Sequence, residues 1–569
     1  ASIRLLAAAL AVCLLLPLMG CGEREPQPAT EVERLSKLCR VWGYVKYTHP
    51  AFLLGQKDWD EELLTLIPQV RELETEQEVN ALLHKWFMGL GEIDYGTNKP
   101  VRFWAEAAEK DRLVITDTSW TTDAEYLGTD LAGDLGQLGE IPDITLRKGP
   151  VKYQRDSLTE VTYPIFTREK DYPDMDFSDP GYRLLGLFRA WNILEYYFPY
   201  HDLLDRAWEE EMDELIPVML AGEDQNSYLQ TIYALLAHLH DNHAGIMSQR
   251  YDYTLALDLP VWDIPVYVTE AEGKLVVSDV TEDCPLARGD IILEMNGMSV
   301  EEAVQILKPY TSCSRDSVFL SQHTDEILHE MSSIQDPATV TVLREGEEET
   351  FSFSWPWSIT SGSPREAYLI LEGNIGLINP ESFRSTLFRN MMEDLRSTNG
   401  LIIDLRQYPP VGMLGISSYF TSEYNPIFIH SSPSKAVPGA YVREVHSDGY
   451  RPEDAELGAY YYDKPVVVLI DEFSQSASEW AAWSIGKGEN VVLMGQNTSG
   501  AMDRIGNAPL PGGDWFMFTA IRAELDDGSQ VQRVGITPDI PVSRTIQGIK
   551  EGRDELMEAA MDYINRQKG

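Results

Sequence analysis

The sequence predicts a multidomain α/β protein whose last third is built on a mixed, largely parallel sheet. Its 569 residues are enough for about three to five folded units. Beyond residue 365, continuous Val, Ile and Leu runs alternate with helical stretches, which is typical of a parallel sheet covered on both faces. In the first half, residues 34–68 recur as residues 183–217 at an offset of 149, with 14 of 35 positions identical. We therefore expect repeated helical units followed by a sheet unit.

The charge of the chain excludes one class of partner. Lys and Arg number 46 and Asp and Glu number 91, which gives a net charge of −45. Nucleic-acid phosphates require a cationic surface, so nucleic acid is not expected as the main partner. With 43% hydrophobic and 10% aromatic residues, the chain is also too apolar for a disordered acidic tail. It is expected to be a large, folded, acidic protein.

The N-terminal segment has the pattern of an export signal. Arg4 precedes an apolar run at residues 5–18, and Leu-Met-Gly leads into Cys21. Such a run is typical of a secretory signal and short for a membrane span. The Leu-Met-Gly-Cys sequence resembles a bacterial lipobox, which implies cleavage before Cys21 and attachment of lipid to that cysteine. We therefore expect an exported protein held in the cell envelope by a lipid anchor. An ordinary signal peptide that happens to end in Cys is the alternative.

The two repeat copies are predicted to be small helical units. Each has apolar residues at helical spacing, with Pro near the helix ends, which indicates two or three helices. The copies diverge at their ends, where only the second carries His243. Between them lies a stretch rich in Thr, Asp, Gly and Pro, which predicts a β-rich or irregular connector. The predicted units are a signal peptide at 1–21, a linker at 22–30, helical copy one at 31–95, the connector at 96–179, helical copy two at 180–250, a β unit at 259–356 and the sheet unit at 365–569.

The β unit at 259–356 consists of short β-type runs. Residues 284–297, with a Gly-Asp turn at Gly289 and an Asn-Gly hairpin at Gly297, resemble a PDZ domain. That resemblance implies capture of an extended peptide by strand addition, often through the peptide's C-terminal carboxylate. An insertion at about residues 308–335 departs from the compact pattern. A spacer domain without a ligand is the alternative.

A candidate nucleophile lies in the last third. An apolar strand at residues 465–470 leads into a polar turn that opens a helix. A serine at that position lies at a helix N-terminus, where backbone N–H groups favour a developing oxyanion. The alternative is that Ser474, Ser476 or Ser478 only caps the helix.

The motif Ser476-Ala477-Ser478-Glu479 resembles the nucleophile motif of the C-terminal processing, or tail-specific, peptidases. The likeness extends from about residue 367 to the C-terminus, and the PDZ-like segment upstream fits the domain order of that family. It rests on further segments at residues 403–409, 495–500, 510–513, 527–528 and 534–540. The resemblance implies that Ser478 is the nucleophile. It also implies an oxyanion hole from the N–H of Glu479 and one N–H of the 407–411 loop, where Tyr408 stands.

The resemblance also suggests the base. Ala501 stands where the tail-specific enzymes carry a lysine, so a Ser-Lys dyad is absent. Tricorn-like relatives take a histidine from an Asp-x-His segment, and His243 in Asp-Asn-His fits that role. An imidazole suits general base and then general acid work. Those relatives place a Glu where Gln532 stands, so the partner that orients the histidine is open, with Asp503 as a possible substitute.

Two other functions compete with this hypothesis. His238, His240 and His243 almost spell the zinc motif of metallo-β-lactamase-like proteins, but Asn242 replaces the required Asp. The absent lysine and Gln532 also suit an inactive lipoprotein that keeps the fold to bind peptides. The prediction that we favour is an exported serine endopeptidase, without metal or cofactor, that acts on peptide or protein substrates. In it, His243 deprotonates Ser478.

Overall fold

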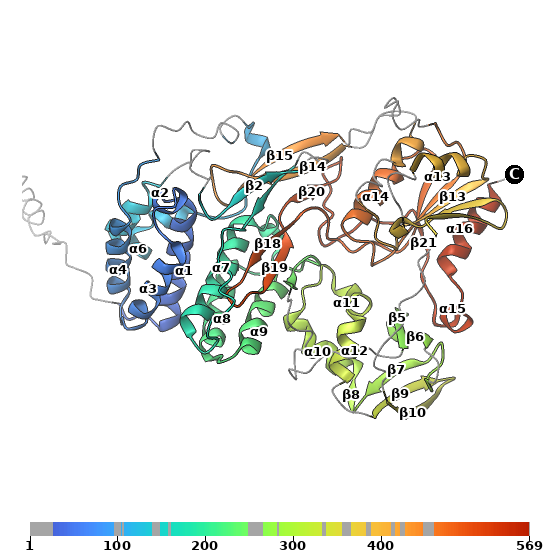
Figure 1. Ribbon diagram of the computed structural model, residues 1–569, viewed down its shortest axis with the longest axis horizontal. Coiled ribbons are helices and arrows are strands. Elements are labelled where there is room, and N and C mark those ends of the chain that lie inside the picture. The colour runs from blue at the N-terminus through green and yellow to red at the C-terminus, as the bar shows by residue number, and fades with distance from the viewer. Residues whose placement is uncertain are drawn as a thin grey trace, which may run out of the picture.

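The computed structural model describes residues 27–95, 104, 107–138, 148–156, 161–247, 266–280, 284–332, 337–354, 366–382, 388–410, 416–421, 427–447 and 460–567. The predicted signal peptide and Cys21 lie outside these residues. Within the described ranges, no helix is both long enough and apolar enough to cross a bilayer. The helices of the first half lie at one end of the molecule and the C-terminal sheet lies at the other (Figure 1).

Each repeat copy forms three main helices, as the spacing predicts. The first copy contains α1 (Glu31–Thr48), the short α2 (Pro50–Leu53), α3 (Trp59–Arg71) and α4 (Glu76–Gly89). The second contains α7 (Pro180–Tyr197), α8 (Trp208–Ala221) and α9 (Gln225–Ala237). Acceptor side chains such as Thr30 and Asp224 begin these helices in capping boxes. The repeat in sequence is therefore a repeat in structure.

The two copies pack as pseudo-symmetric halves of one core. Trp42 Nε1 donates to the carbonyl of Trp59 at 2.8 Å, and the equivalent Trp191 Nε1 donates to the carbonyl of Trp208 at 3.0 Å. Helices α1 and α7 touch where Gly43 meets its own equivalent, Asn192, and a Cβ on Gly43 would lie 1.6 Å from the Asn192 Oδ1 atom. Ion pairs between the copies follow the same symmetry, since Arg40 pairs with Glu209 at 3.3 Å and Arg189 pairs with Asp60 at 2.7 Å.

The connector differs from its prediction. Within the described part of residues 96–179, the main element is a helix, α6 (Ala124–Leu135), which packs against α4. The strands are short: β1 (Arg112–Val114), β2 (Lys152–Arg155) and β3 (Thr162–Ile165). Gly128 has a φ of 74° and interrupts the helix, which obscures its periodicity in the sequence. The connector is therefore mixed, with a helix and short strands, and not β-rich.

The C-terminal unit is a six-stranded sheet covered on both faces, which confirms the predicted mixed parallel sheet. Its order is β11-β12-β13-β16-β17-β21, and only the β11–β12 pair is antiparallel. Helices α13 (Phe388–Leu395) and α14 (Ala477–Gly486) pack on one face and α16 (Glu555–Arg566) packs on the other. The strands are β11 (Tyr368–Leu371), β12 (Ile375–Ile378), β13 (Gly400–Asp404), β16 (Val466–Ile470), β17 (Val491–Gly495) and β21 (Ile540–Pro541).

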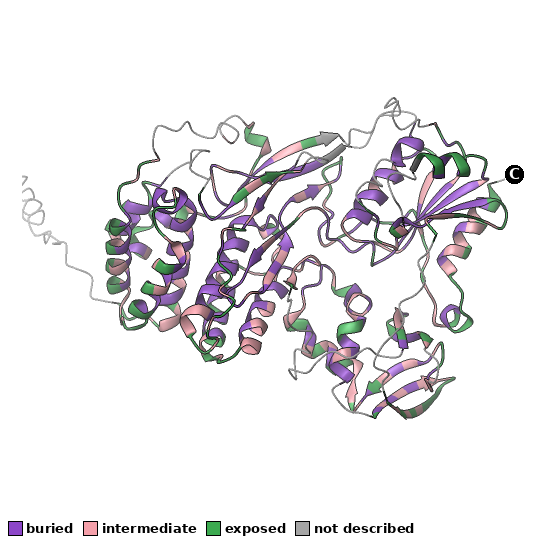
Figure 2. Ribbon diagram, viewed as in Figure 1, coloured by how far each residue is buried: buried purple, intermediate pink, exposed green. Residues whose placement is uncertain are grey.

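A hairpin of β18 (Ile505–Pro509) and β19 (Trp515–Thr519) leaves this unit and joins the helical one. Strand β19 pairs with β4 (Gly245–Met247), which directly follows the second repeat copy. Phe516 and Phe518 are buried in the same core as the repeat helices. Burial colours the ribbon in Figure 2, where much of this hairpin is drawn as buried. Residues 505–519 therefore belong in space to the helical unit and not to the predicted 365–569 unit. A four-stranded sheet, β1-β15-β14-β20, adds a second link, through β14 (Ile427–Pro433), β15 (Ala440–Ser447) and β20 (Arg522–Glu524).

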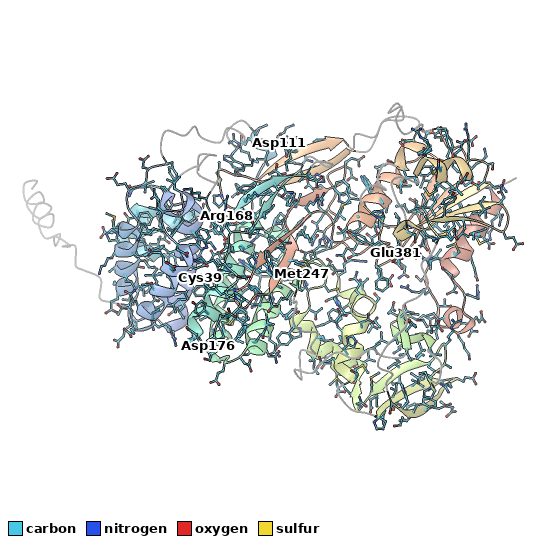
Figure 3. The ribbon with its side chains drawn as sticks, viewed as in Figure 1. Cys39, Asp111, Arg168, Asp176, Met247 and Glu381 are labelled. Carbon is cyan, nitrogen blue, oxygen red and sulfur yellow. The ribbon has the colours of Figure 1, made fainter. Side chains whose placement is uncertain are left out.

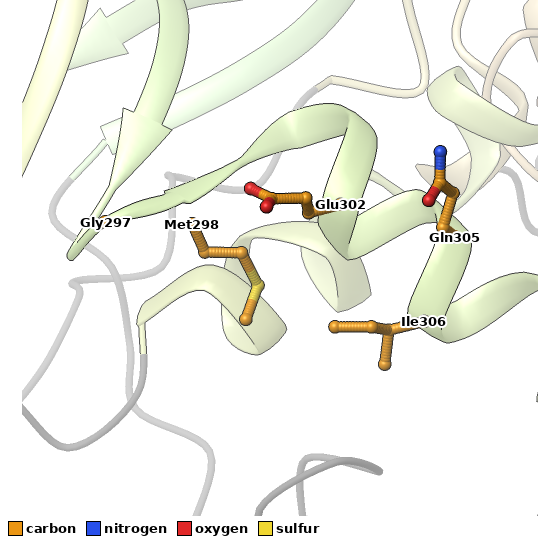
Figure 4. A pocket seen from close by; sticks show the side chains of 5 residues that line it. All are labelled: Gly297, Met298, Glu302, Gln305 and Ile306. Atoms are coloured by element: carbon orange, nitrogen blue, oxygen red, sulfur yellow. The ribbon is translucent and has the colours of Figure 1, made fainter.

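The β unit is an antiparallel sheet with helices on one face. The sheet order is β10-β9-β7-β6-β5, and β8 pairs with β7. The predicted insertion forms α11 (Phe319–Gln322) and α12 (Thr324–Ser332), and α12 packs against β5, β7 and α10. A hollow of about 370 Å³ opens beside α10, at Met298 and Ile306 (Figure 4). The other elements are β5 (Val266–Ala271), β6 (Lys274–Val280), β7 (Ile291–Met295), β8 (Met298–Ser299), α10 (Val300–Leu307), β9 (Ala338–Arg344) and β10 (Glu347–Phe353).

Candidate active site

The turn between β16 and α14 is strained at Ser476. This residue has φ 54° and ψ −110°, a conformation that non-glycine residues rarely adopt and that costs about 1–3 kcal/mol. The Ser476 N–H donates to the carbonyl of Ala501 at 3.0 Å and to Glu479 Oε2 at 3.2 Å. Ser476 is half-buried and stands immediately before the helix. Strain of this kind at a strand-to-helix turn is typical of an exposed serine nucleophile.

Ser478, the nucleophile predicted from the sequence, lies inside the first turn of α14. Ser478 is 1% exposed, and its Oγ is buried without a hydrogen-bond partner. A substrate carbonyl has to reach the attacking oxygen, so accessibility favours Ser476 over Ser478.

The carboxylate of Glu479 holds the turn against the following loop. It accepts hydrogen bonds from Thr498 Oγ1 at 2.6 Å, from Gly500 N at 2.8 Å and from Ala501 N at 3.2 Å. Burial raises the pKa of Glu479 to about 7, although these hydrogen bonds act in the opposite direction. The side chain therefore has a scaffolding role that the sequence prediction, which used only the Glu479 N–H, did not include.

The two predicted oxyanion residues follow neighbouring strands, Glu479 after β16 and Tyr408 after β13. The Glu479 N–H belongs to the first turn of α14, where backbone N–H groups lack partners within the helix. Tyr408 lies in the loop after β13 and is 57% exposed, and the two prolines that follow it carry no N–H. Ser474 Oγ joins this loop to the serine turn by donating to the carbonyl of Leu405 at 2.9 Å.

His243 stands in the turn between α9 and β4, above a buried carboxylate. Its Nδ1 lies 2.8 Å from Thr519 Oγ1. Asp241 is 0% exposed and accepts from four donors, namely His243 N at 3.1 Å, Thr519 N at 2.7 Å, Thr519 Oγ1 at 2.8 Å and Gln532 Nε2 at 3.2 Å. Burial lowers the pKa of His243 below its usual 6.5, and the carboxylates of Asp241 and Asp503 act in the opposite direction.

Asn242 links the histidine loop (residues 238–244, between α9 and β4) to the serine turn (residues 471–476, between β16 and α14). Its carbonyl accepts from Gln475 Nε2 at 3.4 Å, and its Nδ2 donates to Ser499 Oγ at 2.8 Å, which in turn lies 3.3 Å from Gln475 Oε1. Gln475 directly precedes Ser476. Met247, labelled near the centre of Figure 3, marks the end of β4, which this loop enters. Within the residues that the structure describes, no hydrogen bond joins His243 to either serine, and such bonds often form only when substrate binds.

The insertion of the β unit also contacts this loop. Ser312 Oγ accepts from the N–H of Asp241 at 2.9 Å, and Ser314 Oγ accepts from the N–H of Asn242 at 3.0 Å. Arg315 NH2 donates to the carbonyls of Asn497, at 3.1 Å, and Thr498. These residues could not be predicted from the sequence, because isolated serines in a long insertion match no motif.

The other predicted polar residues have different partners. Asp503 forms an ion pair with His430 at 3.0 Å, beside the ring of Trp480, and not with His243. His238 pairs with Glu211 at 2.9 Å and His240 pairs with Asp205 at 2.9 Å. The three histidines of the predicted zinc motif therefore have separate partners. Across the described parts of the chain, no group of three His, Cys, Asp or Glu residues is arranged to hold a metal ion.

Replacing Gln532 by glutamate is expected to weaken this site, although the family resemblance puts a glutamate at that position. Gln532 is 1% exposed and donates to Asp241, so Gln532→Glu brings two buried carboxylates together. We expect a loss of about 2 kcal/mol or more in the free energy of unfolding at pH 8. The loss should shrink toward pH 5, because a protonated glutamate again donates a hydrogen bond. Urea unfolding at both pH values measures it.

The control for this change is Gln532→Met, which removes the donor without adding charge. It is expected to cost about 1 kcal/mol at either pH. Equal stability of Gln532→Glu and the unaltered protein at pH 8 would show that the Asp241 carboxylate does not face this side chain.

Part of the chain is similar to known peptidases. Residues 374–542 match the model of peptidase family S41. A carboxy-terminal-processing protease of Bartonella bacilliformis is 26% identical over 227 residues, which are 38% of this chain and 50% of that protein. This chain therefore spans about half the length of the curated relative. Residues 374–542 are therefore similar to a domain of peptidase family S41, and the similar protein is a protease.

Solved structures show the same fold. The crystal structure of mature CPAF superposes with a TM-score of 0.53 at 15% identity, over 68% of this chain and 96% of that one. Mature CPAF complexed with lactacystin gives a TM-score of 0.50 at 15% identity, over 68% of this chain and 98% of that one. The likeness extends beyond residues 374–542.

Proposed function

We propose that this chain is an exported serine endopeptidase of the tail-specific type, in which a serine of the β16–α14 turn attacks the peptide carbonyl and His243 accepts its proton. The S41 domain supports the reaction class. The observation that carries the catalytic pair is the contact of Asn242 with Gln475 and Ser499, which holds the histidine loop against the serine turn.

Of the two serines in the motif, Ser476 is the nucleophile that we propose. Its strained turn and partial exposure favour it, while Ser478 Oγ is buried. Ser478, which the sequence motif suggested, is the alternative, and it requires the first turn of α14 to open when substrate binds. The two serines make different predictions for site-directed labelling.

The proposed reaction proceeds through an acyl-enzyme. His243 removes the hydroxyl proton as the serine oxygen bonds to the peptide carbonyl carbon, and the resulting oxyanion faces the N-terminal amides of α14. His243 then gives the proton to the leaving amine. Water, deprotonated by the same imidazole, releases the acyl group and restores the serine. The N–H groups of Glu479 and Tyr408 are the proposed oxyanion donors.

A fluorophosphonate probe tests the catalytic pair, because it reacts only with an activated serine. We expect labelling of the full chain at Ser476, located by peptide mapping, and its loss in His243→Ala. Label on Ser478 would assign that serine instead. No labelling together with no peptide hydrolysis would favour the alternative of an inactive peptide-binding lipoprotein. Hydrolysis that persists without label and is lost to a chelator would favour the zinc alternative at His238, His240 and His243.

The pH dependence of hydrolysis is expected to reflect the buried imidazole. His243 acts as base only when neutral, and burial lowers its pKa. Activity should therefore persist below pH 6.5 and fall with a single proton at a lower pH. The measurement is kcat/KM for a fluorogenic peptide between pH 4 and 8. An acid limb centred above pH 6.5 would contradict the assignment of His243 as a buried base.

Two further parts of the proposal concern the surroundings of the site. Lipid on Cys21 is proposed to anchor the protein on the outer side of a membrane. The β unit, through its PDZ-like pattern, is proposed to bind peptide or protein substrates, including by their C-terminal ends. Radiolabelled palmitate incorporation that disappears in Cys21→Ser tests the anchor, and unchanged incorporation in that variant would contradict it.

A further inference from the structure

We infer that Thr519 and Asp241 are positioning residues that hold His243 in the tautomer needed for a base, with the proton on Nδ1 and the lone pair on Nε2. This inference rests on the proposed role of His243. It fills the place of the orienting partner, which the sequence left open between Asp503 and Gln532.

The positions of the protons follow from the donors and acceptors of three side chains. An ionised carboxylate only accepts, so the 2.8 Å contact between Thr519 Oγ1 and Asp241 Oδ1 uses the single hydroxyl proton of Thr519. The hydroxyl then has only lone pairs for the 2.8 Å contact with His243 Nδ1. The proton in that second contact therefore comes from the imidazole. In the neutral ring, this leaves Nε2 unprotonated.

The relay is needed because the direct contact is too long. His243 Nδ1 lies 3.9 Å from Asp241 Oδ1, beyond hydrogen-bond range. The threonine hydroxyl bridges this gap with two bonds of ordinary length. When His243 accepts the serine proton, Nδ1–H still faces Thr519, and the negative charge of Asp241 stabilises the imidazolium through the hydroxyl. No proton has to leave Asp241 or Thr519 in either state.

The bridge is rigid because backbone structure fixes both of its ends. Thr519 is the last residue of β19, and its N–H donates to Asp241 Oδ2 at 2.7 Å. Asp241 is itself fixed by the N–H of His243, by Gln532 and by the Ser312 hydroxyl at its own N–H. Asp241 and Thr519 are both fully buried. A buried network whose donors are paired in this way specifies one arrangement.

The test combines a tautomer measurement with kinetics on the full chain. Thr519→Val keeps the shape of the side chain and removes the hydroxyl. In histidine-labelled protein, ¹⁵N NMR is expected to show a protonated Nδ1 and an unprotonated Nε2 for His243, a signal identified by its loss in His243→Gln. Thr519→Val should convert this signal into the Nε2-protonated form or a mixture. It should also lower kcat/KM about 100-fold, the scale of a misplaced general base.

Two variants separate positioning from general damage to the fold. Thr519→Ser restores the hydroxyl and should recover the Nδ1-protonated signal and most of the activity. Thr398→Val removes another buried threonine hydroxyl, which bonds to Leu395 and Tyr462 away from the site, and should change neither readout. A Thr519→Val protein that keeps the Nδ1-protonated form, or a Thr519→Ser protein that does not regain it, would overturn the inference.

The tautomer readout also separates this inference from the proposed function. If the unaltered protein shows the Nδ1-protonated signal but hydrolyses no peptide and takes no fluorophosphonate, the proposed function fails and the positioning of the imidazole stands. If it hydrolyses peptide while His243 carries its proton on Nε2, the proposed function stands and the positioning role fails.

Discussion

Ser476→Ala is expected to abolish peptide hydrolysis, with a fall of about 10⁴-fold or more in kcat. The reason is that the residue in the strained turn supplies the attacking oxygen, and water cannot replace a serine held next to a base. KM should change little, because alanine removes only the hydroxyl. The measurement is single-turnover cleavage of a fluorogenic peptide by purified full-length protein.

Ser478→Ala is the matched control, two residues further along the chain and inside the first turn of α14. Its Oγ makes no hydrogen bond, so the change removes an unsatisfied buried atom and should leave kcat within about threefold. The opposite result, with Ser478→Ala inactive and Ser476→Ala active, would restore the nucleophile assigned from the motif. Equal activity of both variants and the unaltered protein would contradict the serine mechanism as a whole.

Arg189→Met is expected to destabilise the helical unit by about 3–5 kcal/mol, because it leaves two buried carboxylates without their arginine partner. The Arg189 side chain is 0% exposed and pairs with Asp60 at 2.7 Å and with Glu169 at 3.2 Å. It also donates to the carbonyl of Pro509 at 2.9 Å, at the end of β18. Lys46, paired with Glu169, would remain as the buried cation beside both carboxylates in the described part of the chain. Urea unfolding followed by tryptophan fluorescence measures the change.

The repeat provides the control for this change. Arg40 is the symmetry equivalent of Arg189, but its partner Glu209 has a side chain that is 40% exposed. Water screens such a pair, so Arg40→Met is expected to cost about 1 kcal/mol or less. If both arginines cost the same, burial does not set the energy of these ion pairs. Arg189→Met should also reduce activity, since it loosens the hairpin that carries Thr519.

Much of the architecture could be predicted from periodicity and repetition. The strand runs around Val466 and Leu401 specify a buried parallel sheet because their residues alternate between two apolar faces. Apolar residues at helical spacing and Pro near the helix ends predicted two or three helices in each copy, and the structure has three main ones. The β18–β19 hairpin could not be placed in this way. Its alternating apolar residues suit packing on any core, and only the folded chain shows that they pack on the repeat helices.

The site residues that belong to a motif could be predicted, and those whose role depends on burial or on distant contacts could not. His243 and the serine turn were found from spacing and family resemblance, and the structure brings their loops into contact. The resemblance pointed to Ser478, whereas the exposure of the two residues favours Ser476, because exposure depends on how the folded turn packs and not on the local pattern. Thr519 was not predicted, because its contact with His243 depends on the pairing of β19 with β4. These two strands lie about 270 residues apart in the chain.

The pairing of β19 with β4 also bears on the stage of synthesis and folding at which the candidate active site can be complete. His243 and Thr519 are separated by 276 residues, and Asn242 and Ser499 by 257. Contacts over such distances form late in folding, after local helices and strands. A chain that has been synthesised only as far as the serine turn lacks the hairpin that fixes the imidazole. Under the proposed function, the order of the sequence therefore places completion of the catalytic site after synthesis and folding of nearly the whole chain.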